Sequence, residues 1–442
     1  MHDRPYQAPD AESVRLTLHG ASMPVEWGVP PVPWLTACGC RLVSRMHTPR
    51  TLLTVLACAA LTAIAADALA QSTIKTCSAG IGRDFPSVPA DSRTLAIGPL
   101  IRLFKSLDKQ RIDVRAFLLL KDCGLVVERY KAGLTRDQNH AVYSVTKSVV
   151  STLVGTLLKD RKIPGLDLPV SSIMKRPAGT KDAHWERAST LTLRNVMNMA
   201  SGFAYVHSPT HSPLYDTRTN AFIYALSQGI AAKPGERFNY SDADASITGA
   251  VVSSAAGDSL YAYAQRALFD PLRMFNHEWW FRDAAGRYPG GWGLRLRPMD
   301  MLKLGQLYVQ KGEWNGQQLF DPEYPSMAWA RGPSPEYGLH WWIGRPVRSP
   351  GDERYAAIGL KGQRIYVYPN LGIVVAIVAS LTGDEERQLA SATLAAVLES
   401  AAKANGAEAS VAVKAELADL VRSGFRGVTR VKQSLQDMPG HP

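Results

Sequence analysis

Strand-like runs at both ends of the chain, with a helix-rich middle between them, constrain the fold more than any other feature of this sequence. Near the N-terminal end, residues 114–133 read VRAFLLLKDCGLVVERYKAG, two β-rich runs around a turn-forming Asp-Cys-Gly, which predicts a hairpin. Toward the C-terminal end the strand-like runs are YGLHWWIG, RYAAIGL, GQRIYVYP and GIVVAIVAS. Residues 96–109 and 385–404 have the character of helices outside these strands.

The middle of the chain, about residues 160–300, holds helical segments broken by Gly and Pro. Together these patterns predict an α+β fold: one antiparallel sheet built from N- and C-terminal strands, with flanking helices, plus a mostly helical lobe. A site is expected in the cleft between the lobes. The chain of 442 residues, 46% of them hydrophobic, is large enough for such a core. We expect the folded domain over residues 96–400 and a peripheral helix or tail over 401–442.

A leader-like segment precedes this domain. From Met46 the sequence reads MHTPRTLLTVLACAALTAIAADALAQS, a short basic start, an apolar run and a small-x-small site that ends at Ala70. This is the layout of a secretory signal peptide, and the apolar run is short for a transmembrane helix. We expect a signal peptide over residues 46–70, no stable membrane span after its cleavage, and an unfolded upstream extension over 1–45. The protein is then exported, to the periplasm; an uncleaved membrane anchor is the alternative.

Export leaves Cys77 and Cys123 in the mature chain, where an oxidising compartment favours one disulfide and two free thiols are the alternative. The formal net charge is +11, but no basic run or nucleic-acid-binding module accompanies it, so we expect no nucleic-acid partner. Zinc-type Cys or His spacing is absent after the leader. His207 and His211 are four residues apart, in a loop rich in Ser, Pro and Thr where they need not share a face. We expect no metal site.

The most informative short motif is Ser144-Val-Thr-Lys147. The chain holds five Ser-x-x-Lys pairs, but only this one stands where a predicted strand pair leads into an apolar helix. A hydroxyl at such a helix N-terminus lies where backbone N–H groups favour a developing negative charge, and one helical turn puts Lys147 on the same face. For Lys147 to act as a base it must be neutral, which requires burial or a nearby cation. The alternative is a helix-capping serine followed by a lysine with a buried stem.

Further segments, in a fixed order along the chain, indicate which kind of protein carries this motif. After LVVERYKAG and SVTKSVVSTLVGTLL come IPGLDLPVSSIM, LTLRNVMNMASGF, KPGERFNYSDADASITGAVV, GGWGLRLRPMDMLKLGQLYVQKGEWNGQQL, YGLHWW and GLKGQRIYVYPNLGIVVAIVAS. Over residues 100–395 the chain resembles the serine β-lactamase and penicillin-binding-protein superfamily, in its class C-like branch. Within that branch it is similar to the 6-aminohexanoate-dimer hydrolase and esterase group, which hydrolyses esters or small linear amides.

The resemblance implies roles for individual residues. Ser144 corresponds to the acylated nucleophile and Lys147 to its proton acceptor. Tyr240, in Tyr240-Ser241-Asp242, corresponds to the phenol or phenolate that moves protons to the leaving group and activates the deacylating water. The family usually has Asn at the last position of this element. The carboxylate of Asp242 favours a charged Lys147, although it can also hold its partners by hydrogen bonds.

The family's third element, normally Lys-Thr-Gly or His-Thr-Gly on an inner strand, aligns with Leu360-Lys361-Gly362. Gly362 is retained, and the N–H of Gln363 would complete an oxyanion hole with the N–H of Ser144. Lys361 stands one position late and, by strand alternation, should point to the other face of the sheet. The resemblance therefore favours an ester or amide substrate over a β-lactam.

The sequence thus predicts an exported serine hydrolase that cleaves an ester or linear amide of a small molecule through a Ser144 acyl-enzyme, without a cofactor. The first alternative is a class C-like β-lactamase or a D-alanyl-D-alanine carboxypeptidase. The second is a catalytically silent envelope-binding protein with the same fold. The sequence leaves the natural substrate and the oligomeric state open. Aromatic residues that could line an acyl pocket, most of them better explained as core, are Tyr215, Trp279, Trp280, Trp292, Trp341 and Trp342.

Overall fold

The computed structural model describes residues 77, 81–89, 95–207, 212–344, 353–403 and 409–427. The predicted signal peptide and upstream extension lie outside these residues, as does His211. Within the described part of the chain, no helix is long and apolar enough to cross a membrane.

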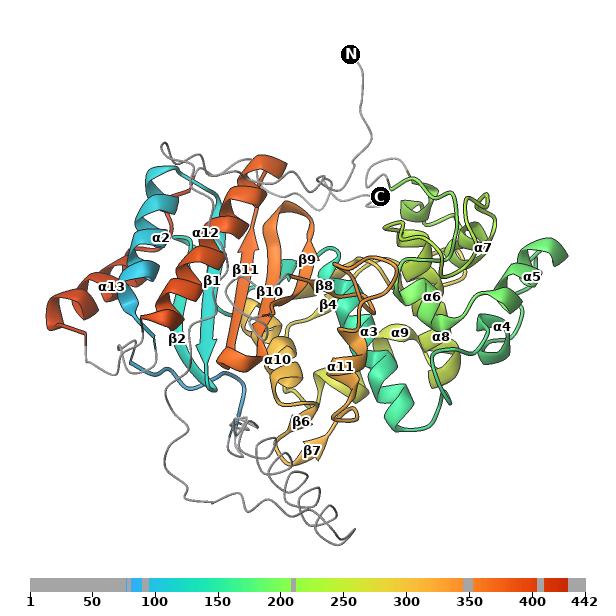
Figure 1. The fold of residues 1–442 in the computed structure, drawn as a ribbon, viewed down its shortest axis with the longest axis horizontal. Helices are drawn as coiled ribbons and strands as arrows, with labels where there is room; N and C mark the ends of the chain where they lie inside the picture. The colour runs from blue at the N-terminus through green and yellow to red at the C-terminus, as the bar shows by residue number, and fades with distance from the viewer. Residues whose placement is uncertain are drawn as a thin grey trace, which may run out of the picture. The chain divides into compact units, whose positions relative to one another are not determined.

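A six-stranded antiparallel sheet forms the centre of the fold, in the order β2-β1-β11-β10-β9-β8 (Figure 1). Its strands are β1 (Val114–Lys121), β2 (Gly124–Tyr130), β8 (Trp342–Ile343), β9 (Tyr355–Gly359), β10 (Gln363–Tyr368) and β11 (Ile373–Ala379). The first and last strands of the chain pair directly, with Phe117 opposite Ile377. The predicted α+β fold, with its sheet built from both ends of the chain, is confirmed.

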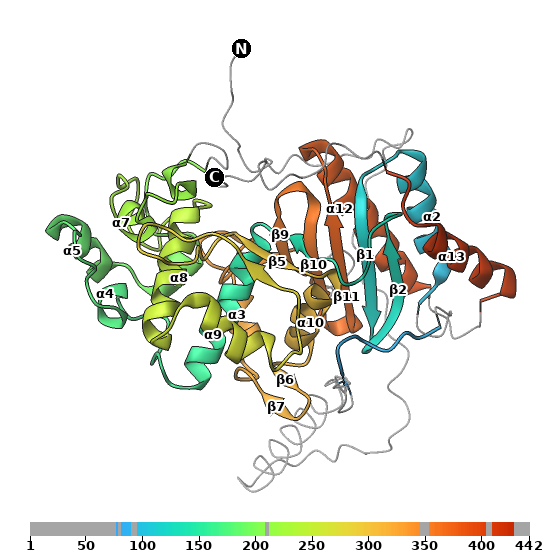
Figure 2. The ribbon, with the colours of Figure 1, turned by 180° about the vertical axis from the view of Figure 1, so that it is seen from behind.

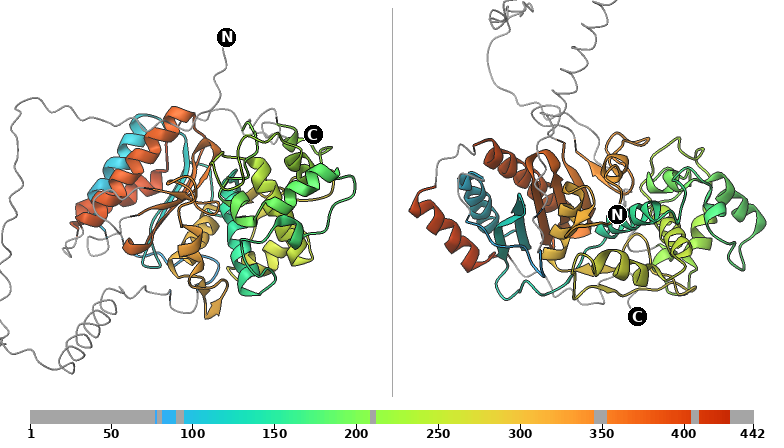
Figure 3. Two further views of the ribbon diagram at one scale, coloured as in Figure 1. Left: turned by 45° about the vertical axis from the view of Figure 1, so that its right-hand side comes forward. Right: turned by 90° about the horizontal axis from the view of Figure 1, so that it is seen from below.

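Helices cover both faces of this sheet, which explains why β11 is apolar throughout and does not alternate. Phe117 and Leu119 of β1 face α2 (Ile97–Lys109), α12 (Gly383–Ala402) and α13 (Val411–Ser423), and pack in one hydrophobic cluster. Leu118 and Leu120 belong to a second cluster on the opposite face, with residues of α3 (Val145–Lys159) and α10 (Pro298–Val309). Figure 3 shows α2 and α12 side by side on their face of the sheet.

The helical lobe consists of short helices around one longer one, α8 (Asp242–Ala256). The others are α4 (Val170–Ile173), α5 (Asp182–Thr190), α6 (Leu193–Met197), η1 (Pro213–Tyr215), α7 (Ala221–Leu226), α9 (Leu260–Ala264) and η2 (Gln265–Phe269). Helix α3 lies between the sheet and this lobe, in contact with β9, β10 and α8 (Figures 1 and 2). Because it is enclosed on all sides, α3 is buried around its whole circumference from Val145 to Leu157.

Small additional elements complete the fold. They are β3 (His140–Ala141), β4 (Glu278–Trp279) and β5 (Leu294–Leu296) in one sheet, β6 (Glu313–Trp314) and β7 (Gln317–Gln318) in another, and α11 (Tyr324–Ala328). In the region predicted as a peripheral helix or tail, α13 contacts α2 and β2, and Phe425 is buried against Phe104 with ring centroids 5.7 Å apart.

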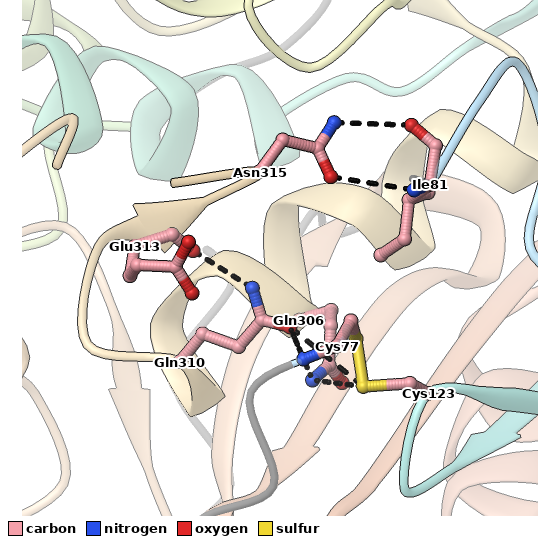
Figure 4. Close-up of a disulfide and its surroundings, with 7 residues drawn as sticks. All are labelled: Cys77, Ile81, Cys123, Gln306, Gln310, Glu313 and Asn315. Carbon is pink, nitrogen blue, oxygen red and sulfur yellow. Dashed lines mark hydrogen bonds between the residues drawn. A yellow bond between two sulfur atoms is a disulfide. The ribbon is translucent and has the colours of Figure 1, made fainter. Parts of the chain in front are cut away.

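Cys77 and Cys123 form a disulfide, with Cα atoms 5.4 Å apart (Figure 4). It ties the first described residue to the turn between β1 and β2. Gln310, at the end of α10, accepts a hydrogen bond from the N–H of Cys77 at 2.9 Å and donates one to the carbonyl of Glu313 at 2.7 Å. The disulfide thus fastens Cys77 to the turn between β1 and β2, and the hydrogen bond from its N–H fastens it to the end of α10.

Candidate active site

Ser144 lies at the N-terminus of α3, directly after a strained backbone turn. Tyr143, the preceding residue, has a φ of +48°, a left-handed conformation that is unfavourable for a side chain of this size. Ser144 occupies the N-cap position, but its hydroxyl forms no capping hydrogen bond among the described residues. Instead, its Oγ accepts a hydrogen bond from the Nζ of Lys147 at 3.0 Å. The arrangement differs from that of a helix-capping serine.

Lys147 is enclosed and its ammonium group is fully hydrogen-bonded. Its side chain is 1% exposed, and Nζ donates to Ser144 Oγ, to Asp242 Oδ1 at 2.5 Å and to the carbonyl of Gly291 at 3.1 Å. Burial alone lowers the pKa of Lys147, but the negative charge of Asp242, with Tyr240, outweighs burial and the net direction is upward. Three acceptors for three N–H groups match the charged form of the amine.

Asp242 is the first residue of α8, and each of its carboxylate oxygens has partners. Oδ1 binds Lys147, while Oδ2 accepts a hydrogen bond from the hydroxyl of Tyr215 at 2.5 Å. The Nδ1 atom of His207 lies 3.4 Å from Oδ2. Burial raises the pKa of Asp242, but Lys147 and His207 lower it by more, and the carboxyl stays ionised. The residue that replaces the usual Asn is thus the counter-ion of Lys147, in the direction expected from the sequence.

Gly291 owes its place in the site to its lack of a side chain. A Cβ atom at this position would lie 2.9 Å from Asp242 Oδ1 and 3.2 Å from Lys147 Nζ. The main chain can therefore approach the ion pair closely enough for its carbonyl to take the third ammonium proton.

Tyr240 faces the same lysine from the segment before α8. The Nζ of Lys147 lies 4.9 Å from the centre of its ring, and the ring stacks on Trp342 at 5.7 Å. The ring of His207 meets Tyr240 edge to face at 5.3 Å. Ser241 begins α8 as its N-cap, with its hydroxyl accepting from the N–H of Asp244 at 3.0 Å, and so fixes where the Tyr240 side chain leaves the backbone.

The turn between β9 and β10 lies against the segment that carries Ser144. A Cβ on Gly359 would lie 2.2 Å from the carbonyl oxygen of Val142, so the two main chains touch where only glycine fits. Leu360, the next residue, is 46% exposed. Gln363 is 1% exposed, pairs with Gly359 in the sheet, and donates from its side chain to the carbonyl of Ala379 at 2.8 Å.

The expectation that Lys361 points to the other face of the sheet is wrong. Residues Leu360–Gly362 form a 3-10 turn, and Lys361 itself has a φ of +63°, so strand alternation does not apply to it. Its Nζ lies 6.0 Å from the centre of the ring of Tyr143, the residue before Ser144. Gly362, with a φ of +94°, completes the turn.

Residues 100–399 match the family model described as Beta-lactamase. The chain belongs to the Beta-lactamase family. A 6-aminohexanoate-dimer hydrolase of Paenarthrobacter ureafaciens is 22% identical over 343 residues, which cover 70% of this chain and 84% of that protein. The fold and the order of the motifs thus place the protein among the serine hydrolases of the β-lactamase and penicillin-binding-protein superfamily.

Solved structures of other proteins share the fold. A Bacillus anthracis protein provisionally named 6-aminohexanoate-dimer hydrolase aligns with a TM-score of 0.58 at 20% identity, covering 70% of this chain and 86% of that one. The octameric penicillin-binding protein homologue of Pyrococcus abyssi aligns with a TM-score of 0.53 at 19% identity, covering 68% and 77%. At these identities the likeness establishes the architecture alone.

The sequence does not predict three of the contacts around Lys147 and Asp242, those of His207, Tyr215 and Gly291. It suggests His207 only as a metal ligand and Tyr215 only as an acyl-pocket residue. In the described residues, no group of three or more His, Cys, Asp or Glu side chains could hold a metal ion. Trp279, Trp292 and Trp341 are buried in the core. The departure from Asn at position 242 was the one signal that unusual partners should be sought.

A cavity of about 930 Å³ in the helical lobe has none of these groups in its lining, which comes from α4, α5, α8 and their neighbours. The site is therefore located by its chemistry and not by the size of a cavity.

Proposed function

We propose that the protein is a hydrolase that cleaves an ester or a linear amide of a small molecule through an acyl-enzyme on Ser144. One observation carries the proposal: the Ser144 hydroxyl, free of any capping role among the described residues, lies 3.0 Å from the Nζ of a buried Lys147 at the N-terminus of α3. This arrangement serves nucleophilic attack, in which a positioned amine takes the hydroxyl proton.

In the proposed reaction, neutral Lys147 accepts the proton of Ser144 as Oγ bonds to the substrate carbonyl carbon. The leaving alcohol or amine takes a proton from Lys147 or Tyr240 as its bond to carbon breaks. Water then attacks the acyl carbon and gives up a proton to the same pair of residues. The bond from that carbon to Oγ breaks, Ser144 takes a proton back from this pair, and the acid is released. Because Asp242 favours the charged amine, neutral Lys147 is a minor form near neutral pH. Activity should therefore rise with pH.

The developing oxyanion needs two backbone donors. The N–H of Ser144, at the positive end of α3, supplies one. We assign the second to the turn Leu360–Gly362 or the residue directly after it, because Gly359, directly before the turn, lies against Val142 of the segment that carries Ser144. Gln363, the residue expected for this role, begins β10 directly after the turn and stays the predicted donor; Leu360, which opens the turn and is partly exposed, is the alternative.

Two observations bear on the substrate. The relative from Paenarthrobacter ureafaciens is named for hydrolysis of a linear amide, which supports an amide or ester here. Lys361, beside Tyr143, offers a cation at the edge of the site, and this favours acyl donors that carry a carboxylate. Because β-lactams also carry one, a β-lactamase or carboxypeptidase is the second candidate.

Export remains part of the proposal. The disulfide between Cys77 and Cys123 fits an oxidising compartment, which the predicted signal peptide would provide. The expected partner of the proposed hydrolase is a small-molecule substrate. The alternative is a catalytically silent envelope-binding protein, and the following experiment tests it.

The test is intact-protein mass spectrometry and product release with p-nitrophenyl butyrate and, separately, a cephalosporin. Wild type is compared with Ser144→Ala and with Ser172→Ala, a matched control because Ser172 stands in another Ser-x-x-Lys pair, on the exposed surface. We expect ester turnover that is lost in Ser144→Ala and kept in Ser172→Ala. A Ser144-dependent cephalosporin adduct or turnover would favour the second candidate. If Ser144→Ala changes neither reaction, the silent alternative stands.

A further inference from the structure

The Asp242 carboxylate is shared between two basic groups that lie on its two sides. Lys147 binds Oδ1 at 2.5 Å, while His207 Nδ1 approaches Oδ2 to 3.4 Å. The Nδ1 atom is itself shielded from solvent and has no hydrogen-bond partner among the described residues. A shielded ring nitrogen 3.4 Å from a carboxylate oxygen gains a hydrogen-bond partner when it carries a proton and donates it to that oxygen.

His207 borders this buried charge pair and is itself partly exposed to solvent. The side chains of Lys147 and Asp242 are 1% and 3% exposed, whereas that of His207 is 22% exposed. Its ring packs edge to face on Tyr240, so it borders the nucleophile side of the site as well. A proton taken up from solvent at His207 therefore arrives next to the counter-ion of Lys147.

We propose that His207 is a positioning residue that shares the Asp242 carboxylate with Lys147 and thereby makes the reactivity of Ser144 depend on pH. The inference rests on the proposed function, since it concerns the base of that reaction. An imidazolium at His207 draws on the same negative charge that holds the Lys147 ammonium. Neutral Lys147, with its lone pair directed to Ser144, then becomes a larger fraction of the enzyme.

The direction of the effect follows from like-charge repulsion. A second positive charge beside Asp242 disfavours the ammonium form of Lys147, so protonation of His207 lowers the pKa of Lys147. When His207 is neutral, the pKa of Lys147 stays high. Imidazoles ordinarily change charge between about pH 5 and 8. The enzyme should therefore lose less reactivity on acidification than it would with an uncharged residue at position 207.

Most titratable groups around this pair stay neutral over the same range. Burial raises the pKa of the neighbouring tyrosines and, with the charge of Lys147, lowers the pKa of His340 to about 3. Burial raises the pKa of Asp244 to about 7, so this carboxyl needs its own control. The groups that face the His207–Asp242 pair are Lys147, Tyr205, Tyr215, Tyr240, Asp244, Tyr337 and His340.

The test follows the rate of Ser144 labelling by a fluorophosphonate from about pH 5 to 9, which requires no knowledge of the substrate. His207→Gln should match wild type near pH 9 and react about tenfold more slowly near pH 5, a shift of about one pK unit in Lys147. His207→Lys, charged throughout, should keep the acid-side rate. His184 lies on α5 outside the site, and His184→Gln should follow the wild-type profile. Asp244→Asn is the control for the other group that titrates in this range.

A double-mutant cycle tests the route through Asp242. If His207 acts by sharing that carboxylate, the change caused by His207→Gln disappears when Asp242 is already Asn. An equal change in both backgrounds would overturn the proposal, as would parallel pH profiles of His207→Gln and wild type.

A second measurement separates this inference from the proposed function. The ¹³Cε resonance of Lys147 in the full-length protein, assigned with Lys147→Arg, reports the charge of the amine whether or not any substrate is turned over. We expect the titration of Lys147 to show an additional step that is absent in His207→Gln. Loss of labelling at Ser144 with this step intact would count against the hydrolase assignment alone. A Lys147 titration insensitive to His207 would overturn the inference alone.

Discussion

Replacement of Asp242 by the Asn usual in the family should shift the pH at which this enzyme works. In the structure, Asp242 Oδ1 lies 2.5 Å from the Lys147 ammonium, and the negative charge is spread over both oxygens and shared with Tyr215. For unit charges about 4 Å apart at an effective dielectric constant of about 20, Coulomb's law gives about 4 kcal/mol, or about three pK units. Asn keeps an oxygen for Lys147 and offers its NH₂ to the Tyr215 hydroxyl, so the packing should survive.

The acid limb of kcat/KM for p-nitrophenyl butyrate should therefore move about two to three pH units lower in Asp242→Asn. The assay follows ester cleavage at a wavelength where absorbance does not depend on pH. Asp244→Asn is the matched control: it lies on the same helix, is equally buried and makes its hydrogen bonds to Ser201 instead of Lys147. An acid limb that stays in place, or moves to higher pH, would refute the view that Asp242 holds Lys147 in its charged form.

Further predictions concern the packing of the site and the stability of the fold. Gly291→Ala would put a methyl group 2.9 Å from the buried carboxylate oxygen, and we expect kcat/KM to fall about tenfold or more with an unchanged CD spectrum; full activity would contradict the close packing. Burial raises the pKa of Asp244 to about 7, from the value of about 3.9 typical of an unfolded chain. Its contribution to stability is thus complete below about pH 4 and lost as pH rises through about 7. Urea unfolding of Asp244→Asn should show a weaker decline over that window, and a slope equal to that of wild type would argue against the shift. Cys77→Ser with Cys123→Ser opens a loop with a sequence separation of 46 and should cost about 4 kcal/mol at most, seen as a lower Tm without reductant. With reductant, variant and wild type should melt together; a gap that persists would point to lost packing instead.

How far the sequence predicts this structure depends on whether a feature is local. The sheet could be predicted because β1 and β11 are long apolar runs, and both faces of the sheet are covered, so neither run needs to alternate. Ser144 and Lys147 could be paired because they are one helical turn apart, within a segment whose neighbours follow the family's order. Both predictions use information contained in short stretches of chain.

Contacts made by tertiary packing were out of reach. Tyr215 precedes Asp242 by 27 residues and comes from a 3-10 turn, so no periodic pattern relates the two. His207 belongs to a segment rich in Ser, Pro and Thr, which shows no periodic pattern that would predict its contact with Asp242. For Lys361 a local pattern was misleading. The alternation of side chains along a strand was assumed, but Lys361 has a positive φ and lies in the turn before β10.

Two Ser-x-x-Lys pairs of this chain differ in the surroundings of their lysines. At Ser172 the lysine three residues on is exposed to solvent, where an amine stays charged at neutral pH and its hydration competes with any bond to the serine. At Ser144 the lysine is enclosed, and its protonation is decided by its neighbours: one carboxylate, one carbonyl and the serine itself. With Asn in place of Asp242, the same enclosure would favour the neutral amine. In the proposed mechanism, the residue at position 242 therefore governs the pH at which Lys147 can accept the proton of Ser144.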